Sequence, residues 1–138
     1  MVWRDSGVRV LLAMGIVVLL VAACGSAGGS PEPTTLTAAA NGTTVQATVG
    51  ENLFIALEAN PTTGYRWQVQ PGLDPSVVTF VGDDYQQGPS ASGTVGAGGT
   101  DTLEFLAAGK GTTTIALTYA QVGSGDVGST FSVKVEVR

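Results

Sequence analysis

The segment Phe131-Ser132-Val133-Lys134-Val135-Glu136-Val137 alternates apolar and polar side chains without a break. Successive side chains of a β-strand point to opposite faces, so this period of two predicts a strand with one buried face and one exposed face. Valine and aromatic residues favour the same extended conformation. The segment therefore predicts a half-buried β-strand at the end of the chain.

Seven further segments upstream have apolar patterns that are typical of short strands, and none keeps the helical period of 3.6 for long. Turn residues separate them at near-regular spacing, as at Asn41-Gly42 and Gly82-Asp83-Asp84. Seven or eight short strands predict an all-β fold, an Ig-like antiparallel β-sandwich, in which Trp67 fills the core from a central strand. The upstream segments are residues 36–40, 45–49, 53–57, 65–69, 77–81, 103–105 and 115–119.

The start of the chain predicts export and lipid anchoring. Arg4 and Arg9 accompany an apolar run over residues 10–21, which is shorter than the roughly 20 residues of a membrane span. The run ends in Val21-Ala22-Ala23-Cys24, which resembles a bacterial lipobox. We expect a signal peptide over residues 1–23, and acylation of Cys24 that anchors the exported protein to the cell membrane or envelope. The alternative is an ordinary cleaved signal with an incidental thiol.

Small residues and prolines continue to Thr35 and predict a flexible tether over residues 24–35, followed by one domain over residues 36–138. The chain has no histidine and a single cysteine, which excludes the common catalytic triads and most transition-metal sites. Asp83 and Asp84 would point to opposite faces of a strand, so they make a poor acid/base pair; we expect a solvated turn there, with a weak calcium site as the alternative. These features predict a binding domain that is not an enzyme and needs no cofactor.

The net charge of −5 disfavours nucleic acid as a partner and suits a basic protein. Three connections are longer than strand pairing requires: residues 60–64, 86–100 and 120–130. Loops at the same end of a sandwich can form one composite binding edge. The sequence therefore favours a protein partner that binds at one end of the domain, and we expect the domain to be a monomer.

The first connection, Asn60-Pro61-Thr62-Thr63-Gly64-Tyr65, has strong conformational restraints. Pro61 fixes its own φ and moves Asn60 out of the helical region, and Gly64 permits a positive φ. Thr62 and Thr63 are stiff at χ1 because both are β-branched. We expect a narrow, preorganised protrusion with two short hydroxyl side chains at its tip, which loses little entropy on docking. The alternative is a well-made turn without a partner.

The same loop, followed by Trp67, resembles the signature loop of the chagasin-type inhibitors of papain-like cysteine proteases. The segment Gly96-Ala97-Gly98-Gly99-Thr100 is similar to the second, glycine-rich loop of that family. The strand that ends at Tyr119 also falls in family order. The resemblance covers roughly residues 36–138.

The resemblance implies a reversible, non-covalent inhibitor with a wedge of three loops at one end of the sandwich. It implies that Thr62 and Thr63 sit nearest the nucleophile of the protease, while Pro61 and Gly64 keep the tip in shape. The backbone of Gly96, Ala97, Gly98 and Gly99 would approach one wall of the cleft, and the third loop, residues 120–130, would grip the other through Ala120, Gln121 and Val122. Tyr65, a candidate contact, is interpreted mainly as a core support, as is Trp67.

One departure from the family pattern concerns the third loop. The family typically has an Arg-Pro-Trp type segment after the tyrosine, whereas Ala120-Gln121-Val122 follows Tyr119 here and a glycine-rich stretch comes next. Arginine and tryptophan are favoured at interface hot spots. We therefore expect weaker or differently selective inhibition, with a target protease from the same cell, a host or a competitor. The alternative function is an Ig-like envelope interaction module that binds another surface protein without inhibiting a protease.

Overall fold

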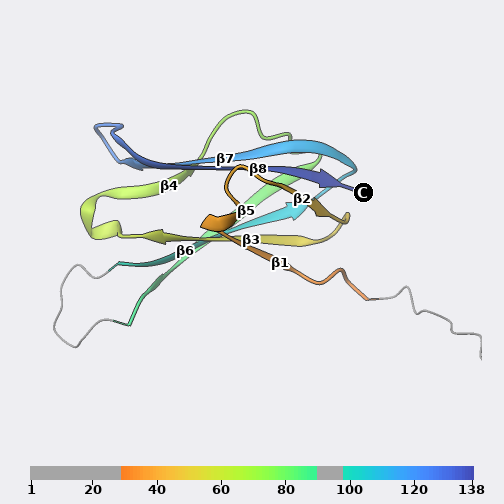
Figure 1. The fold of residues 1–138 in the computed structure, drawn as a ribbon, viewed down its shortest axis with the longest axis horizontal. Coiled ribbons are helices and arrows are strands. Elements are labelled where there is room, and N and C mark those ends of the chain that lie inside the picture. Colours follow the sequence, from red (N-terminus) through yellow and green to blue (C-terminus); the bar gives the residue numbers. More distant parts are fainter. Residues whose placement is uncertain (1–28, 90–97) are drawn as a thin grey trace, which may run out of the picture.

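The structure, a computed structural model, describes residues 29–89 and 98–138 as two four-stranded sheets packed face to face (Figure 1). The strand order is β1-β3-β6-β5 in the first sheet and β2-β8-β7-β4 in the second. This architecture confirms the predicted β-sandwich. The strands are β1 (Thr34–Thr37), β2 (Thr44–Ala47), β3 (Asn52–Ala59), β4 (Tyr65–Val69), β5 (Val78–Gln87), β6 (Gly99–Ala107), β7 (Gly111–Gln121) and β8 (Val127–Val137).

The two N-terminal strands differ from the antiparallel expectation, because β1 pairs in parallel with β3 and β2 in parallel with β8. The sheets are therefore mixed. The expected strand over residues 36–40 is also shorter: β1 begins at Thr34, inside the expected tether, and gives way to a 3₁₀ turn, η1 (Ala38–Ala40). Alanine is depleted in strands, and this alanine run carries the chain from one sheet to the other.

Three other expectations placed turns or loops where strands continue. The turn expected at Gly82-Asp83-Asp84 is wrong, because β5 runs on to Gln87 with a register shift between Phe80 and Gly82 that absorbs the irregular residue. The connection expected over residues 86–100 loses its ends to β5 and β6. The connection expected over residues 120–130 is reduced to residues 122–126, since β7 and β8 form a long hairpin.

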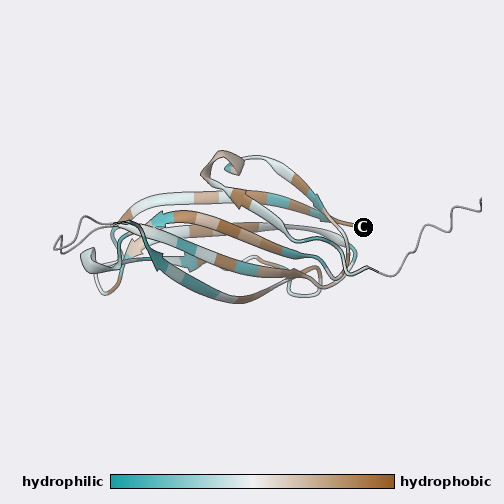
Figure 2. Cartoon of the chain, turned by 90° about the horizontal axis from the view of Figure 1, so that it is seen from below, coloured by the Kyte–Doolittle hydropathy of each residue, from teal (hydrophilic) through white to brown (hydrophobic). Residues whose placement is uncertain are grey.

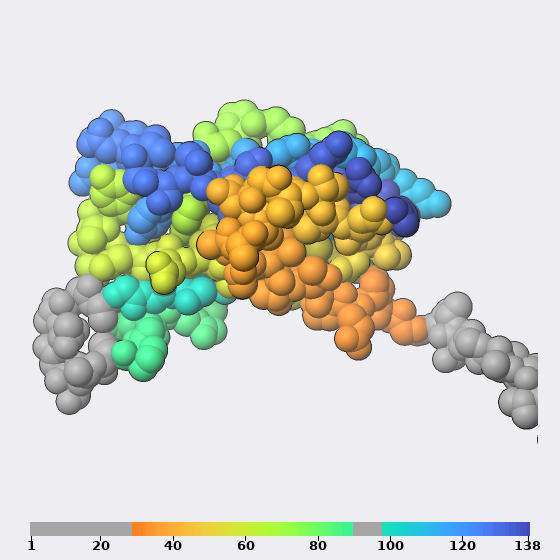
Figure 3. Space-filling model, in the orientation of Figure 1, coloured from red at the N-terminus to blue at the C-terminus, as the bar shows by residue number. Residues whose placement is uncertain are grey.

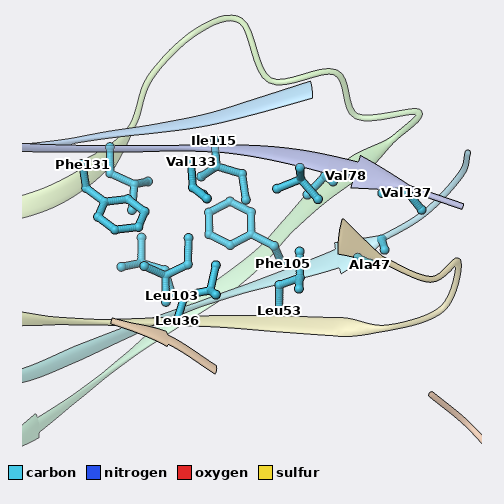
Figure 4. Packing of buried hydrophobic residues seen from close by; sticks show 14 of the residues in the cluster. Leu36, Ala47, Leu53, Val78, Leu103, Phe105, Ile115, Phe131, Val133 and Val137 are labelled. Atoms are coloured by element: carbon cyan, nitrogen blue, oxygen red, sulfur yellow. The ribbon is translucent and has the colours of Figure 1, made fainter. Parts of the chain in front are cut away.

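The inner faces of both sheets form one apolar core, as the alternating colours along the strands show (Figure 2). The ring of Phe105 lies between the two sheets, close to Ile115 and Val133 (Figure 4). Burying each large apolar side chain of this kind contributes about 1.5–3 kcal/mol. Trp67 packs against the core only in part, and the expected central position is wrong, because β4 is an edge strand.

Strand registers place three connections at the same end of the sandwich. Ala59 at the end of β3 pairs with Gly99 at the start of β6, and Gly99 also pairs with Gln87 at the end of β5. Tyr65 at the start of β4 pairs with Gln121 at the end of β7. We call this end the loop end; its described residues are 60–64, 88–89, 98 and 122–126. It is the left end in Figure 1.

The chain enters the sandwich at the opposite end, because Thr34 of β1 pairs with Leu53 near the start of β3. Glu51 fixes this entry: its carboxylate accepts hydrogen bonds from the Thr34 hydroxyl at 2.5 Å and from the Thr48 N–H at 2.9 Å. Within residues 29–89 and 98–138, no helix has the length and apolar character needed to cross a membrane.

Candidate functional site

The connection between β3 and β4 is a 3₁₀ turn, η2 (Pro61–Thr63), capped at both ends. Asn60 is extended rather than helical (φ −137°, ψ 89°), and its Oδ1 accepts a hydrogen bond from the Thr62 N–H at 3.3 Å. Gly64 ends the turn in the left-handed region (φ 83°), and its N–H donates to the Pro61 carbonyl at 3.1 Å. The predicted effects of Pro61 and Gly64 on the backbone are confirmed. The 3₁₀ turn itself was not predicted, although asparagine before proline is typical of a helix start.

The two threonines at the tip are exposed, but their hydroxyl protons are used inside the turn. The Thr62 hydroxyl donates to Asn60 Oδ1 at 2.5 Å, and the Thr63 hydroxyl donates to the Asn60 carbonyl at 2.7 Å. The tip therefore offers methyl groups and oxygen lone pairs to a partner, but no free hydroxyl donor. The internal hydrogen bonds also hold both side chains in one rotamer each.

Aromatic side chains from the second sheet hold the first sheet where this turn begins. β1 ends opposite Ala56, so the last residues of β3 have no strand on that side. The Tyr119 hydroxyl accepts a hydrogen bond from the Asn60 N–H at 2.7 Å, and Trp67 Nε1 donates to the Glu58 carbonyl at 3.0 Å. The Tyr119 ring also contacts the rings of Tyr65 and Trp67, at centroid distances of 5.4 and 5.1 Å.

This aromatic support was only partly predictable. Tyr65 and Trp67 were expected to be supports, and the structure places both partly buried beneath the turn. Tyr119 was predicted only as a strand residue. Tyr119 ends an alternating apolar pattern, and a partly buried tyrosine hydroxyl usually has a hydrogen-bond partner. These two features could have indicated its supporting role.

The second predicted segment lies beside the first. A Cβ atom added to Gly98 would lie 3.4 Å from the Ala59 carbonyl oxygen and 3.9 Å from Asn60 Cβ. Gly98 is exposed, whereas a Cβ atom on Gly99 would lie only 2.1 Å from the Gln86 carbonyl oxygen. Glycine at position 99 therefore allows β5 and β6 to lie close together. Gly96 and Ala97 lie outside the described residues.

The third predicted segment is a hydrogen-bonded hairpin turn, although its sequence is rich in glycine. The Val122 N–H donates to the Gly64 carbonyl at 2.9 Å, which joins this segment to the first turn. The Gln121 N–H donates to the Asp126 carbonyl at 2.9 Å, and the Ser124 hydroxyl contacts Gln121 Oε1 at 2.8 Å. Of the three contacts predicted in this segment, Ala120 is buried at 7% exposure, Gln121 is half-buried and Val122 is exposed at 61%.

The three segments form one continuous surface at the loop end. In Figure 3 the blue hairpin lies above the yellow-green β3–β4 connection, with the teal start of β6 below it. A groove of about 920 Å³ opens beside this surface, and Asn60, Trp67, Gly98 and Tyr119 are among the residues that line it. The structure therefore brings together the described members of all three predicted segments.

Asp101, near the loop end, is a buried acid with a raised pKa. It lies on the inner face of β6 at 7% exposure, and its Oδ1 is buried without a hydrogen-bond partner. Burial raises the pKa of this carboxyl, and the negative charge of Asp83 raises the pKa further, while Arg66 opposes the shift. Asp83 and Asp84 themselves are exposed strand residues. Within the described residues, no group of three or more potential ligands could hold a metal ion.

Fold and site together define a class of protein: a small Ig-like binding domain that presents a preorganised cluster of connections at one end. A family model described as Chagasin family peptidase inhibitor I42 matches residues 46–135. The chain therefore belongs to the chagasin family of peptidase inhibitors. Because the family inhibits proteases, this membership confirms the prediction of a binding domain that is not an enzyme.

Individual relatives agree with this assignment. Chagasin from Trypanosoma cruzi is 35% identical over 92 residues, which cover 65% of this chain and 83% of chagasin. The cysteine protease inhibitor EhICP2 from Entamoeba histolytica superposes with a TM-score of 0.67 at 25% identity, over 78% of this chain and 96% of that chain. PbICP-C, solved in complex with falcipain-2, shares the fold at 20% identity with a TM-score of 0.53, over 80% of this chain and 95% of that chain.

Proposed function

We propose that this protein is a reversible, non-covalent inhibitor of papain-like cysteine proteases that inserts residues 60–65 into the active-site cleft. The observation that carries the proposal is the Asn60–Gly64 turn, which is rigid before binding and projects from the end where the other two segments meet. Preorganisation of this kind favours affinity because little conformational entropy is lost on docking. Gly98 and the β7–β8 hairpin would contact the walls of the cleft on either side.

Inhibition would result from steric exclusion. Thr62 and Thr63 would lie over the catalytic cysteine and present only methyl groups and oxygen lone pairs, so the turn supplies no reactive group. A protease cleaves a segment that extends through its cleft, whereas the 3₁₀ conformation of Pro61–Thr63 is held by hydrogen bonds to Asn60. The turn would therefore block the cleft without becoming a substrate.

A papain assay tests this proposal. The full-length protein, purified in detergent, is added to papain, and a fluorogenic peptide substrate reports the remaining activity. We expect competitive and reversible inhibition. The double variant Thr62→Asp, Thr63→Asp should raise Ki by about 100-fold, which corresponds to ~2.7 kcal/mol. The matched control is Thr112→Asp, Thr114→Asp, which changes two exposed threonines of β7 near the opposite end and should leave Ki unchanged.

Normal proteolysis at high micromolar protein would contradict the proposal. That result would favour the alternative of an envelope interaction module, which uses the same end of the sandwich without blocking a protease. Equal losses of inhibition in both double variants would indicate a general loss of structure, which thermal unfolding would reveal.

We also propose that the protein is exported and anchored to the membrane through acylated Cys24, which lies outside the described residues. The entry of β1 at the end opposite the loop end supports this proposal, because the anchor then leaves the inhibitory surface free. Mass spectrometry of the protein from its native membrane should detect acyl chains on Cys24, and Cys24→Ala should release the protein from the membrane. An unmodified Cys24, or a Cys24→Ala variant that stays membrane-bound, would contradict anchoring.

A further inference from the structure

One side of the sandwich lacks a strand in each sheet near the loop end. In the first sheet, β1 pairs with β3 only as far as Ala56. In the second sheet, β2 pairs with β8 only from Lys134 onward. Both short strands belong to the orange N-terminal segment that faces the reader in Figure 3. The groove of about 920 Å³ opens where these strands are missing, because its lining includes residues 57–59 of β3 and residues 129–131 of β8.

The backbone of β3 is already bonded along this groove. The Glu58 carbonyl accepts a hydrogen bond from Trp67 Nε1 at 3.0 Å. The Asn60 N–H donates to the Tyr119 hydroxyl at 2.7 Å. These side chains take the hydrogen-bonding positions that a strand beside β3 would use. A further strand in the groove would therefore not pair with β3.

The backbone of β8, by contrast, is open along the same groove. The Lys134 N–H donates to the Thr43 carbonyl at 3.0 Å. The Ser132 N–H donates to Asn41 Oδ1 at 2.9 Å, so alternate residues of β8 direct their backbone groups away from β7. Thr130 is the next residue in this alternation, it lines the groove, and its N–H and carbonyl form no hydrogen bond within the described residues. The edge of β8 therefore presents one donor and one acceptor to the groove.

The groove also has features that suit particular side chains. Leu57 and Phe131 are buried among its lining residues at 3% and 2% exposure, and Trp67 is partly buried. Glu58 is the charged residue in the described part of the lining, and its exposed carboxylate forms no ion pair or hydrogen bond within the described residues. A basic side chain could lay its aliphatic stem on the apolar surface and place its charge near this carboxylate and the indole ring.

We propose that this groove binds an extended, basic peptide segment of another protein, which adds to β8 as a short antiparallel strand at Thr130. In an antiparallel pair, a single residue opposite Thr130 exchanges both hydrogen bonds with it, which fits a short open edge. Thr130 is exposed and Phe131 is buried, so the side chains on either side of that residue point into the groove. Arginine or lysine there complements Glu58 and the net charge of −5. This binding does not depend on the inhibition of a protease.

An NMR titration tests the proposal. The isotope-labelled full-length protein in non-ionic detergent is titrated with the peptide acetyl-Val-Arg-Val-Arg-Val-amide. We expect the amide resonance of Thr130 to shift with a Kd below about 1 mM, and hydrogen exchange of this amide to become slower. The same peptide with an N-methylated central valine cannot donate to the Thr130 carbonyl, so its Kd should be at least about tenfold higher. The peptide acetyl-Val-Glu-Val-Glu-Val-amide should show an equally raised Kd.

A charge-neutralising variant tests the recognition of the basic side chain. Glu58→Gln keeps the shape of an exposed side chain and should raise Kd for the arginine peptide about tenfold. Glu104→Gln is the matched control, because it removes one negative charge from β6 at a position outside the groove. Its Kd should stay within about twofold of wild type.

Four results would overturn the proposal. The first is a Thr130 amide that does not shift at about 1 mM arginine peptide. Equal binding of the N-methylated peptide would show that no strand is added, and an equal Kd for Glu58→Gln and wild type would show that the groove does not recognise a basic side chain. Shifts of the Thr130 amide that depend on protein concentration, without any peptide, would make a second copy of this chain the occupant instead.

Discussion

At the scale of single residues, the position of the proposed inhibitory turn depends on Tyr119. Its hydroxyl is bonded to the Asn60 N–H, while its ring supports Tyr65 and Trp67. Tyr119→Phe removes the hydrogen bond and keeps the ring. We expect Kd for papain to rise about fivefold, since a hydrogen bond of this kind contributes ~1 kcal/mol.

Tyr65→Phe is the control, because no hydrogen bond of the Tyr65 hydroxyl forms within the described residues. Amide hydrogen exchange at Asn60 should become faster in Tyr119→Phe and stay the same in Tyr65→Phe. Unchanged exchange at Asn60 in Tyr119→Phe would show that the hydroxyl does not position the turn.

Asp101 provides a second prediction at this scale, on the pH dependence of stability. Its pKa is raised in the folded state, first by burial and then by Asp83. The folded state therefore binds this proton more tightly than the unfolded state, and stability falls as pH rises through the raised pKa. Asp101→Asn should stabilise the protein at pH 7 by about 1 kcal/mol, since it removes a buried charge whose Oδ1 has no hydrogen-bond partner, and the gain should vanish at pH 3.

Urea unfolding at both pH values measures this difference. Asp74→Asn is the contrasting variant, because hydrogen bonds from Ser76 lower the pKa of Asp74 and its contribution is lost as pH falls. It should give no stabilisation at pH 7. If Asp101→Asn destabilises at pH 7, the carboxylate has a favourable partner and the account of Asp101 is wrong.

The roles of some of these residues could be predicted from the sequence, and the roles of others could not. The dihedral effects of Pro61 and Gly64 are local, so the sequence predicted them. The roles of Tyr119 and Asp101 depend on atoms that are far away along the chain, and only the fold brings these atoms together.

At the scale of elements, the junction of β5 and β6 is fixed by Gly99. A methyl group there would meet the Gln86 carbonyl oxygen and Gln87 Cα at less than 3 Å. Gly99→Ala should therefore destabilise the protein by about 1–3 kcal/mol, as overpacking does. Gly98→Ala is the control, because its nearest neighbour would be at 3.4 Å, and it should change the unfolding free energy by less than about 0.5 kcal/mol.

Chemical denaturation of the two variants measures these changes. Equal stability of Gly99→Ala and wild type would mean that the strands separate there without cost. The sequence could indicate a glycine-rich segment but could not assign each glycine its role, since one glycine faces a neighbouring strand and the next faces solvent.

For the strands too, features with a local cause could be predicted from the sequence, and features that depend on distant residues could not. Alternating patterns located most strands, because side-chain burial follows the period of the strand. Strand ends were less accurate: β5 continues through Asp83 and Asp84 because an edge strand tolerates acidic side chains. The parallel pairing of β1 and β2 depends on which strand each one meets, and no short pattern specifies that.

At the scale of the whole molecule, charges are distributed unevenly between the two ends. Glu58 and Asp126 lie near the loop end, whereas Lys110 lies in the β6–β7 connection and Arg138 follows β8 at the opposite end. With a net charge of −5, the protein should associate faster with a basic papain-like protease when ionic strength is low. We expect the association rate constant to rise roughly tenfold between 0.15 M and 0.01 M salt, because the Debye length grows from about 8 Å to about 30 Å.

Stopped-flow measurements at several salt concentrations give this dependence. Glu58→Gln, Asp126→Asn should flatten it, and Glu136→Gln, a neutralisation near the opposite end, should flatten it less. A rate constant that is independent of salt for the wild-type protein would contradict steering by the loop end.

The central claim, that the loop end covers the catalytic cysteine of a papain-like protease, is tested most directly by alkylation of that cysteine. Papain is mixed with a saturating amount of the full-length protein in detergent, iodoacetamide is added, and mass spectrometry follows modification of the protease thiol. We predict that alkylation slows by about 100-fold or more, and that it recovers fully once the complex is diluted. Alkylation at the rate of free papain, with the complex demonstrably formed, would show that the protein binds elsewhere and would contradict the account.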